Sequence, residues 1–383
     1  MRKTLATLFL TVVTLLVLGI VLLATASTVR AQGLYADPHY FFKRQLVWLI
    51  LSVCMACVLA TWFDYHWWKQ HRWLPILFYG IVLVGLVLVF FPHIGGKVKG
   101  SYRWLNLGPI HLQPSEFAKI AIIVAMSVWM DRIGWRVRQF VKGALVPAGL
   151  LGLFVALLAV EPDFGATAVV MTLGACIMFV TGTRIWHLLA IGCAGIPPII
   201  LLIASNANRM ERIRAWLQGE DSNSAAAYHL QQAILAFKNG GPWGVGFNQS
   251  IQKYNYLPEA HTDFIFAIGG EEFGFIFSVG VLIAYAILLT CGVLISLRAP
   301  DRLGRLLAFG MTLLLVSQAA FNIGVVTGCL PTKGLALPFI SYGGTNLITA
   351  LFAVGTLFNV GKHIDVFDPR LHTEVVHNAV KDI

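Results

Sequence analysis

Charged residues are scarce in this sequence. Only 12% of its 383 residues are Asp, Glu, Lys or Arg, whereas 57% are hydrophobic. A soluble protein of this length would cover its core with a charged shell, and this composition excludes such a shell. Apolar runs instead recur along most of the chain, each about long enough to cross a ~30 Å hydrocarbon layer as a helix. The sequence therefore predicts a polytopic helical membrane protein.

Several common motifs are also missing. The absence of H-E-x-x-H, P-loop, G-x-S-x-G and dinucleotide fingerprints argues against a metalloprotease, an ATPase, a serine hydrolase and a Rossmann enzyme. Of the six cysteines, five lie inside apolar runs and Cys329 is alone in a loop. The sequence therefore predicts neither a disulfide framework nor a zinc site.

The net charge of +10 is scattered over short loops. A protein that binds nucleic acid would gather its Lys and Arg residues in a basic tail or patch, so we expect no nucleic acid as a partner. Scattered cations at the ends of apolar segments instead favour anionic lipid headgroups or a phosphorylated lipid ligand.

Apolar periodicity predicts an all-α membrane domain with ten transmembrane helices. The chain begins like a secretory signal peptide, but its first apolar segment exceeds the roughly 7–15 residues of such a peptide, so we expect it to stay attached. The ten segments are residues 5–26, 45–62, 74–91, 117–129, 144–160, 166–181, 186–204, 273–295, 303–327 and 347–360.

The connections between these segments predict their orientation. Basic residues follow the second, fourth, sixth and eighth segments, and the positive-inside rule then places both termini in the cytoplasm. A large outer loop, residues 205–263, separates the seventh and eighth helices and should contain short helices at residues 209–216 and 228–237. We expect one membrane domain, residues 1–363, and a cytoplasmic tail, residues 364–383.

Carboxylates crowd the edge of an apolar run at residues 256–274, YLPEAHTDFIFAIGGEEFG. Asp263 either caps the helix that follows it or acts as a general base, since partial desolvation would raise its pKa from ~3.9 towards a useful range. Glu271 and Glu272 lie deeper and must be paired or line a polar cavity. The first turns of this helix either project above the membrane or form a separate piece.

A second polar segment is RWLNLGPIHLQPSEFAK, residues 103–119. Here Ser115 can cap a helix that starts at the next residue. Glu116 and Lys119 stand at i and i+3 on that helix, where they can form a pair. We interpret this pair as structural on spacing alone.

Two further segments break the apolar pattern. In EPDFGAT, residues 161–167, Asp163 can be a helix cap, a cation ligand or the partner of an outer basic residue. LPTKGLALPFISYGGTN, residues 330–346, includes Ser341 just before an apolar helix. Its backbone amides either bind a phosphate or pack within a re-entrant loop.

Basic residues also occur in loops that the orientation places outside the membrane. Short outer loops usually have few cations, so these residues either hold an anionic ligand or contact headgroups and neighbouring loops. They are Lys97, Lys99, Arg103 and Lys333.

Taken together and in this order, the four segments resemble the SEDS family, which includes RodA, FtsW and SpoVE. The resemblance extends from the first helix to about Lys362. Gln252 and Lys253, together with Lys333, are more similar to FtsW than to RodA. Thr345-Asn346 departs from the two serines that are common in the family, which leaves the role of those hydroxyls open.

The resemblance implies an inverting peptidoglycan glycosyltransferase that polymerises lipid II at the outer face of the bacterial cytoplasmic membrane, at the division septum. Asp263 is then the catalytic base, which accepts a proton from a sugar 4-hydroxyl as that oxygen attacks the anomeric carbon of the second substrate. A change from an α-linked lipid sugar to a β-linked polymer requires a single displacement, with undecaprenyl diphosphate as the leaving group.

Substrate-binding residues are also implied. The charge of the leaving diphosphate would be met by protein cations or by a divalent cation such as Mg²⁺ or Mn²⁺. The candidates for the diphosphate and the substrate cavity are Arg103, Lys97, Lys119, Lys333, Glu116, Asp163 and Ser341.

The resemblance further implies partners. The chain has no outer transpeptidase domain with a Ser-x-x-Lys active site, so a class B penicillin-binding protein would cross-link the product, alongside other membrane proteins of the division complex. Two alternatives stay open, a lipid II flippase and a non-catalytic division scaffold. A flippase needs a route across the bilayer, whereas the polar segments here concentrate on one side.

Overall fold

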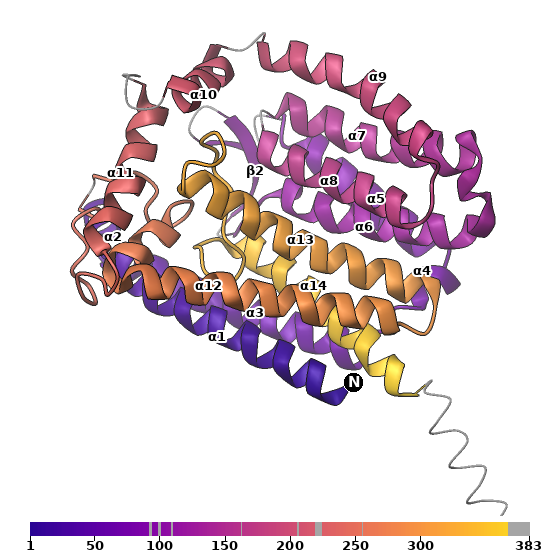
Figure 1. Ribbon diagram of the computed structural model, residues 1–383, viewed down its shortest axis with the longest axis horizontal. Helices are drawn as coiled ribbons and strands as arrows, with labels where there is room; N and C mark the ends of the chain where they lie inside the picture. The colour runs from indigo at the N-terminus through magenta and orange to yellow at the C-terminus, as the bar shows by residue number, and fades with distance from the viewer. Residues whose placement is uncertain are drawn as a thin grey trace, which may run out of the picture.

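The computed structural model describes residues 1–91, 94–98, 101–108, 110–161, 163–204, 207–218, 224–254 and 256–366. Its long helices lie side by side in a bundle, and α2, α10 and α11 gather at one end of it (Figure 1). Each segment predicted to span the membrane overlaps one of these long helices. They are α1 (Arg2–Ala26), α3 (Tyr40–Thr61), α5 (Trp73–Leu88), α6 (Pro114–Ile133), α7 (Val146–Val160), α8 (Phe164–Val180), α9 (Ile185–Ala204), α12 (Ile265–Arg298), α13 (Arg302–Val326) and α14 (Gly344–Val366).

Shorter helices connect them. The two predicted in the outer loop are present as α10 and α11, each longer than expected. The short elements are α2 (Thr28–Tyr35), α4 (Trp67–Gln70), a 3-10 helix (Gly134–Arg138), a π-helical turn (Val141–Leu145), α10 (Ala207–Gln218) and α11 (Ala225–Gly240).

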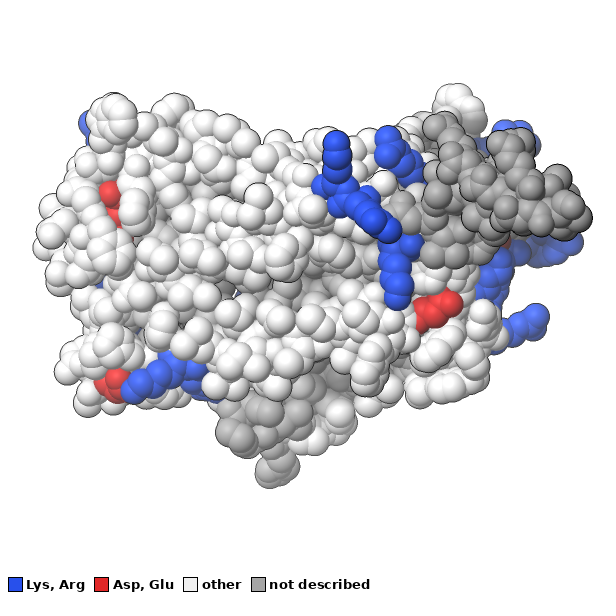
Figure 2. Space-filling model, turned by 90° about the horizontal axis from the view of Figure 1, so that it is seen from below, with Lys and Arg blue, Asp and Glu red and all other residues white. Residues whose placement is uncertain are grey.

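The outer surface of the bundle is apolar. Six helices of the described part of the chain, namely α1, α3, α12, α13, α14 and α7 with its π-helical turn, are long and apolar enough to cross a membrane. Large side chains such as Phe9, Ile50, Ile76 and Phe275 are more than half exposed on this surface. In Figure 2 charged side chains lie towards the two ends and leave an uncharged band between them. Such a band suits a hydrocarbon environment.

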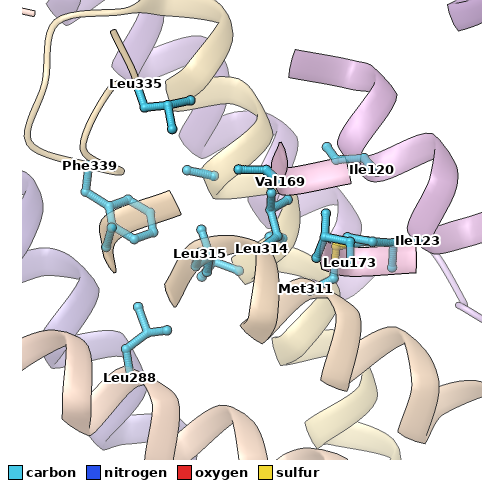
Figure 3. Packing of buried hydrophobic residues seen from close by; sticks show 14 of the residues in the cluster. Ile120, Ile123, Val169, Leu173, Leu288, Met311, Leu314, Leu315, Leu335 and Phe339 are labelled. Carbon is cyan, nitrogen blue, oxygen red and sulfur yellow. The ribbon is translucent and has the colours of Figure 1, made fainter. Parts of the chain in front are cut away.

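Helix α6 lies at the centre of the bundle and contacts α5, α7, α8, α13 and α14. Most of its residues are buried, as expected for a helix that is apolar on all sides. Figure 3 shows Ile120 and Ile123 of α6 beside side chains of α8 and α13, with Phe339 of the 330–343 loop on the opposite side of the group. The other labelled residues of this core are Val169, Leu173, Leu288, Met311, Leu314, Leu315 and Leu335.

A small antiparallel sheet occupies the loop between α5 and α6. It consists of β1 (Gly95–Val98), β2 (Ser101–Leu107) and β3 (Ile110–Leu112), in the order β1-β2-β3. The all-α prediction is wrong in this detail, because strands this short give no clear periodicity in the sequence. Strand pairing satisfies backbone groups of a loop that packs against α6, and it fixes the position of β2 above that helix.

Helix α12 is broken at Gly274, whose φ of 77° and ψ of −168° are not helical. The preceding residues 265–273 therefore form a separate piece, which is one of the two arrangements predicted. The loop after α11 supplies the hydrogen bonds that the break removes, since Phe275 N–H donates to Gly241 O at 2.9 Å and Val245 N–H donates to Glu271 O at 2.9 Å. A Cβ on Gly274 would lie 2.4 Å from Gly244 N.

We predict that Gly274→Ala destabilises the protein by at least about 1 kcal/mol, because its left-handed φ and its close backbone contacts both exclude a side chain. Gly280→Ala is the matched control, since a Cβ at Gly280 meets nothing within 4 Å. Thermal denaturation of both variants in detergent tests this. Equal midpoints for the two variants would contradict the prediction.

Candidate functional site

Polar residues from four separate segments converge at the end of the bundle that includes α10 and α11. Asp263 stands just before α12, and its backbone carbonyl accepts a hydrogen bond from Asn322 Nδ2 at 2.8 Å. Its carboxylate lies over Gly334 so closely that a Cβ there would overlap Asp263 Oδ2. The 330–343 loop therefore approaches Asp263 only because Gly334 has no side chain.

Asp263 does not cap α12. The N-cap residue is Phe264, and no side chain caps this helix end. The structural alternative considered for Asp263 is therefore wrong. Its side chain is instead partly exposed at the end of the bundle.

Two arginines accompany Asp263. Arg103 lies in β2, and Arg212 lies on α10. Partial burial and the neighbouring Arg103 lower the pKa of the Arg212 guanidinium, whereas the Asp263 carboxylate acts in the opposite direction. Arg212 is thus close enough to interact with both Arg103 and Asp263. Sequence reasoning missed Arg212. A signal was present, because three arginines in one short outer helix are an exception to the positive-inside rule.

Asp163 links α8 to the neighbouring segments. Its Oδ1 accepts the N–H of Ala166 at 3.3 Å as the cap of α8, and it lies 3.8 Å from Lys333 Nζ. Burial would raise the pKa of Asp163, but the charges of Lys333 and Arg103 lower it below its usual value. The cap and the basic partner, predicted as alternatives, therefore occur together.

Ser115 also belongs to this group. Its hydroxyl donates to Asp163 Oδ2 at 3.2 Å, and α6 begins at Pro114 without a side-chain cap. The predicted Ser115 cap is therefore wrong. Gln113 Nε2 donates to Ser115 Oγ at 2.9 Å, and Gln113 N–H donates to Thr345 Oγ1 at 3.2 Å. The threonine hydroxyl thus joins the start of α6 to the start of α14.

Below this group lies the predicted pair of Glu116 and Lys119, which is confirmed. Lys119 Nζ donates to Glu116 Oε1 at 2.7 Å, and both residues are buried. Lys119 also donates to Gln318 Oε1 at 3.2 Å, and Thr349 Oγ1 donates to Glu116 Oε2 at 3.3 Å. Gln318 in turn donates to Asn346 Oδ1 at 2.7 Å. A polar layer therefore joins α6, α13 and α14.

Glu161 is a second residue that sequence reasoning left without a role. It is fully buried beside Asp163, and neither carboxylate oxygen has a hydrogen-bond partner among the described residues. Burial and the charge of Asp163 raise the pKa of Glu161 to about 8, although Arg103 opposes the shift. Glu161 is thus mainly a neutral acid at pH 7.

The remaining candidates are more peripheral. Ser341 is buried, and its hydroxyl accepts the N–H of Leu337 at 2.8 Å, which holds the loop in shape. The side chain of Lys97, in β1, and the whole of Lys99 lie outside the described residues. Within the described chain, no three metal-ligating groups come together near Asp263.

Glu271 and Glu272 are paired, as their depth requires. Glu271 accepts a short hydrogen bond from Ser250 Oγ. Glu272 lies 3.3 Å from Lys253 Nζ and accepts from Thr25 Oγ1 at 3.1 Å. These contacts anchor the loop after α11 to α1 and α12.

A cavity of about 410 Å³ opens beside His261, two residues before Asp263. Its wall combines apolar side chains with the ion pair of Arg30 and Glu259, whose charged atoms are 2.8 Å apart. Such a mixed lining suits a molecule with both polar and apolar parts.

Comparison with known proteins relates this arrangement to one family. The family model for FtsW, RodA and SpoVE, described as cell cycle proteins, matches residues 6–365. A probable peptidoglycan glycosyltransferase FtsW of Trichlorobacter lovleyi is 41% identical, with 92% of each chain covered. The stage V sporulation protein E of Bacillus subtilis is 36% identical over 94% of this chain and 98% of its own.

Solved structures have the same fold. A chain of a peptidoglycan synthase complex, studied for the coordination of polymerization and crosslinking, is 28% identical and superposes with a TM-score of 0.75. The match covers 93% of this chain and 97% of the other. Rod shape determining protein RodA of Thermus thermophilus gives a TM-score of 0.66 at 28% identity, over 93% and 95% of the two chains.

We predict that the stability of the Glu161→Gln variant increases relative to that of wild type as the pH rises. In the folded state the pKa of Glu161 is about 8, above its ordinary value of 4.5, so the stability that protonation provides is lost as the pH rises through this range. Glutamine cannot ionise, so the difference in melting temperature between variant and wild type should grow from pH 5 to pH 8. The exposed Glu211, changed to Gln, serves as the control, and parallel curves for Glu161→Gln and wild type would refute the prediction.

Proposed function

Because the chain belongs to the FtsW, RodA and SpoVE family, we propose that it is a peptidoglycan glycosyltransferase whose reaction takes place at the Asp263 cluster. One observation supports this location for the reaction. The partly exposed carboxylate of Asp263 lies with Arg103 and Arg212 at one end of an apolar bundle. The substrate is lipid II, and the product is a glycan strand.

Asp263 is the general base in this proposal. Its carboxylate accepts the proton of the acceptor sugar 4-hydroxyl while that oxygen attacks the anomeric carbon of the donor. The bond from that carbon to the diphosphate breaks in the same displacement, so the configuration inverts and no sugar–enzyme bond forms. Asn322 supports this role, because its hydrogen bond to the Asp263 carbonyl fixes the backbone that carries the base.

The cations around Asp263 bind the diphosphate. Arg103 and Arg212 present guanidinium groups that suit phosphate oxygens. Lys333 lies 3.8 Å from Asp163, a looser pairing than that of the buried Lys119. We therefore assign the leaving diphosphate to Arg103, Arg212 and Lys333, and we assign Lys119 a positioning role. A divalent cation, Mg²⁺ or Mn²⁺, stays a prediction, and no step of the reaction described here depends on it.

The same proposal extends to the membrane and to partners. Ten spans with both termini in the cytoplasm would place residues 205–263 and the Asp263 cluster outside, in agreement with the apolar band of the bundle. The similarity to FtsW proteins and to a peptidoglycan synthase complex supports a place at the division septum with a class B penicillin-binding protein and other division proteins.

The flippase alternative is weaker on physical grounds. A transported headgroup needs a polar route through the bundle, but packed apolar side chains of α6, α8 and α13 lie next to the polar layer of Glu116 and Lys119. Polymerisation needs only an outward site.

We predict that Asp263→Ala and Asp263→Asn lower polymerisation of lipid II by about 100-fold or more, the usual contribution of a general base. The assay reconstitutes the protein with lipid II, alone and with a class B penicillin-binding protein, and follows glycan chain length. Asp37→Asn is the control, because it changes a solvent-accessible carboxylate near the start of α3.

Three outcomes are distinguishable. Loss of polymer with the Asp263 variants alone supports the assignment. Equal polymer from Asp263→Ala and wild type would remove Asp263 from the mechanism. Faster transbilayer movement of labelled lipid II without any polymer would identify a flippase instead.

We predict that Arg212→Ala lowers kcat/KM for lipid II by about 10- to 100-fold, the effect of losing one charge-assisted hydrogen bond. Arg212→Lys should lose less, because it keeps the charge but not the fork of donors. Arg214→Ala, two residues further along the same helix and also at an exposed position, should stay near wild type. Equal losses for Arg212→Ala and Arg214→Ala would argue for a general effect of surface charge.

A further inference from the structure

A second polar cluster lies at the opposite end of the bundle. Helix α3 has 22 residues and is therefore about 33 Å long. Near its start the ring of Phe41 lies 4.7 Å from the ring of His261, beside Asp263. Near its end the carbonyls of Leu59 and Phe63 accept hydrogen bonds from Asn359 of α14. The cluster that follows, around Asp64, is thus one helix length away from the proposed catalytic site.

Three ligand-type side chains meet there. Asp64 and His66 belong to the turn between α3 and α4, and His363 lies in the last turn of α14. Asp64 Oδ1 lies 2.7 Å from His66 Nδ1 and 3.7 Å from His363 Nε2. One donor atom from each of the three residues lies within 4.8 Å of the other two.

The histidine of α14 is oriented for coordination. His363 Nδ1 lies 2.9 Å from the carbonyl oxygen of Asn359. A carbonyl oxygen can only accept, so Nδ1 carries the proton and the neutral ring keeps its lone pair on Nε2, the nitrogen that faces Asp64. A hydrogen bond from the second ring nitrogen to a carbonyl is the usual support of a metal-bound histidine.

The frame around the cluster is rigid. Asn359 donates to two carbonyls of the α3 end and accepts the backbone N–H of Tyr65 at 3.1 Å. The Tyr65 hydroxyl donates to Asp301 Oδ1 at 2.6 Å, next to the start of α13. The turn that carries Asp64 and His66 is therefore held on both sides, so its ligands need little rearrangement to bind an ion.

We propose that Asp64, His66 and His363 form a binding site for a divalent transition-metal ion of the Zn²⁺ class. Two imidazoles and one carboxylate suit such ions, whereas Mg²⁺ and Ca²⁺ prefer oxygen ligands throughout. Tetrahedral coordination with bonds of about 2.0–2.1 Å separates ligand atoms by about 3.3 Å, close to the spacing of this group. The His66 ring would turn slightly, since its 2.7 Å contact with Asp64 is a direct hydrogen bond.

The position of the cluster determines how an ion enters and what its binding does. The three side chains are 22–37% exposed, so an ion can enter and water can complete its coordination. The bound ion would tie the turn after α3 to the last turn of α14. Because it would bind only where these segments meet, it would stabilise the folded bundle by mass action.

The test uses the full-length protein, purified in detergent with a tag that has no histidine and stripped with a chelator. Co²⁺ is the spectroscopic probe and Zn²⁺ the competitor. We expect one Co²⁺ per chain with visible d–d absorption, its displacement by Zn²⁺, a rise in melting temperature, and weaker binding as the pH is lowered. Double substitution His66→Ala and His363→Ala should remove all four effects, whereas substitution His71→Ala, at an exposed histidine just after α4, should keep them.

A further variant guards against loss of binding through misfolding. His363→Cys should still bind Co²⁺ and should add a thiolate-to-cobalt charge-transfer absorption, which only a direct ligand at this position can give. Binding of Co²⁺ by wild type no stronger than by the double variant would overturn the proposal. A melting temperature that changes with pH but not with added metal would also overturn it. The cluster would then be only a histidine–aspartate hydrogen-bond network. None of these measurements depends on glycosyltransferase activity.

Discussion

The buried ion pair of Glu116 and Lys119 is the contact on which the arrangement of the central helices depends. Both charges lie in an apolar interior, where an unpaired charge would cost several kcal/mol. Their remaining hydrogen bonds go to Gln318 of α13 and Thr349 of α14. Three helices are therefore fixed in depth and rotation, because any shift would leave a buried charge without a partner. Such a layer specifies one arrangement of the helices and adds little net stability. It forms the floor beneath Asp263.

Above that floor, two buried carboxyl groups, Asp163 and Glu161, differ in protonation because their surroundings differ. Asp163 stays ionised, since Lys333 and Arg103 outweigh the effect of its burial. Glu161 lies two residues earlier and is also buried. Its carboxylate oxygens have no hydrogen-bond partner among the described residues, and burial and the charge of Asp163 outweigh Arg103, so it keeps its proton near neutral pH. Of the three carboxyl groups, Asp263 is the one that solvent reaches most easily. The site therefore offers one accessible base beside cations that are oriented in advance, an arrangement that favours transfer of charge onto a leaving diphosphate.

Close contacts with the backbone fix the loops at the two ends of the bundle. At the Asp263 end, Gly274 breaks α12 and Gly334 admits the carboxylate, so each loop is fixed by contacts that a side chain would prevent. At the other end, Asn359 binds the carbonyls at the end of α3 and positions the turn with Asp64. The proposed catalytic site and the proposed metal site thus share the rigid pair of α3 and α14, although they differ in chemistry.

The sequence by itself determined the membrane class, the positions of the long helices and the pairing of Glu116 with Lys119, because hydropathy and i, i+3 spacing are local properties of the chain. Its place at the edge of an apolar run also made Asp263 a candidate base, and this role stays a proposal. Only the tertiary structure decided that Ser115 bonds Asp163 instead of capping α6, that Arg212 joins Asp263, and that Glu161 has no partner in the described chain. Those outcomes depend on segments about 50 residues or more apart, and their contacts are set by how the helices pack. The cluster of Asp64, His66 and His363 gave no signal in the sequence for the same reason, since almost 300 residues separate His363 from the other two.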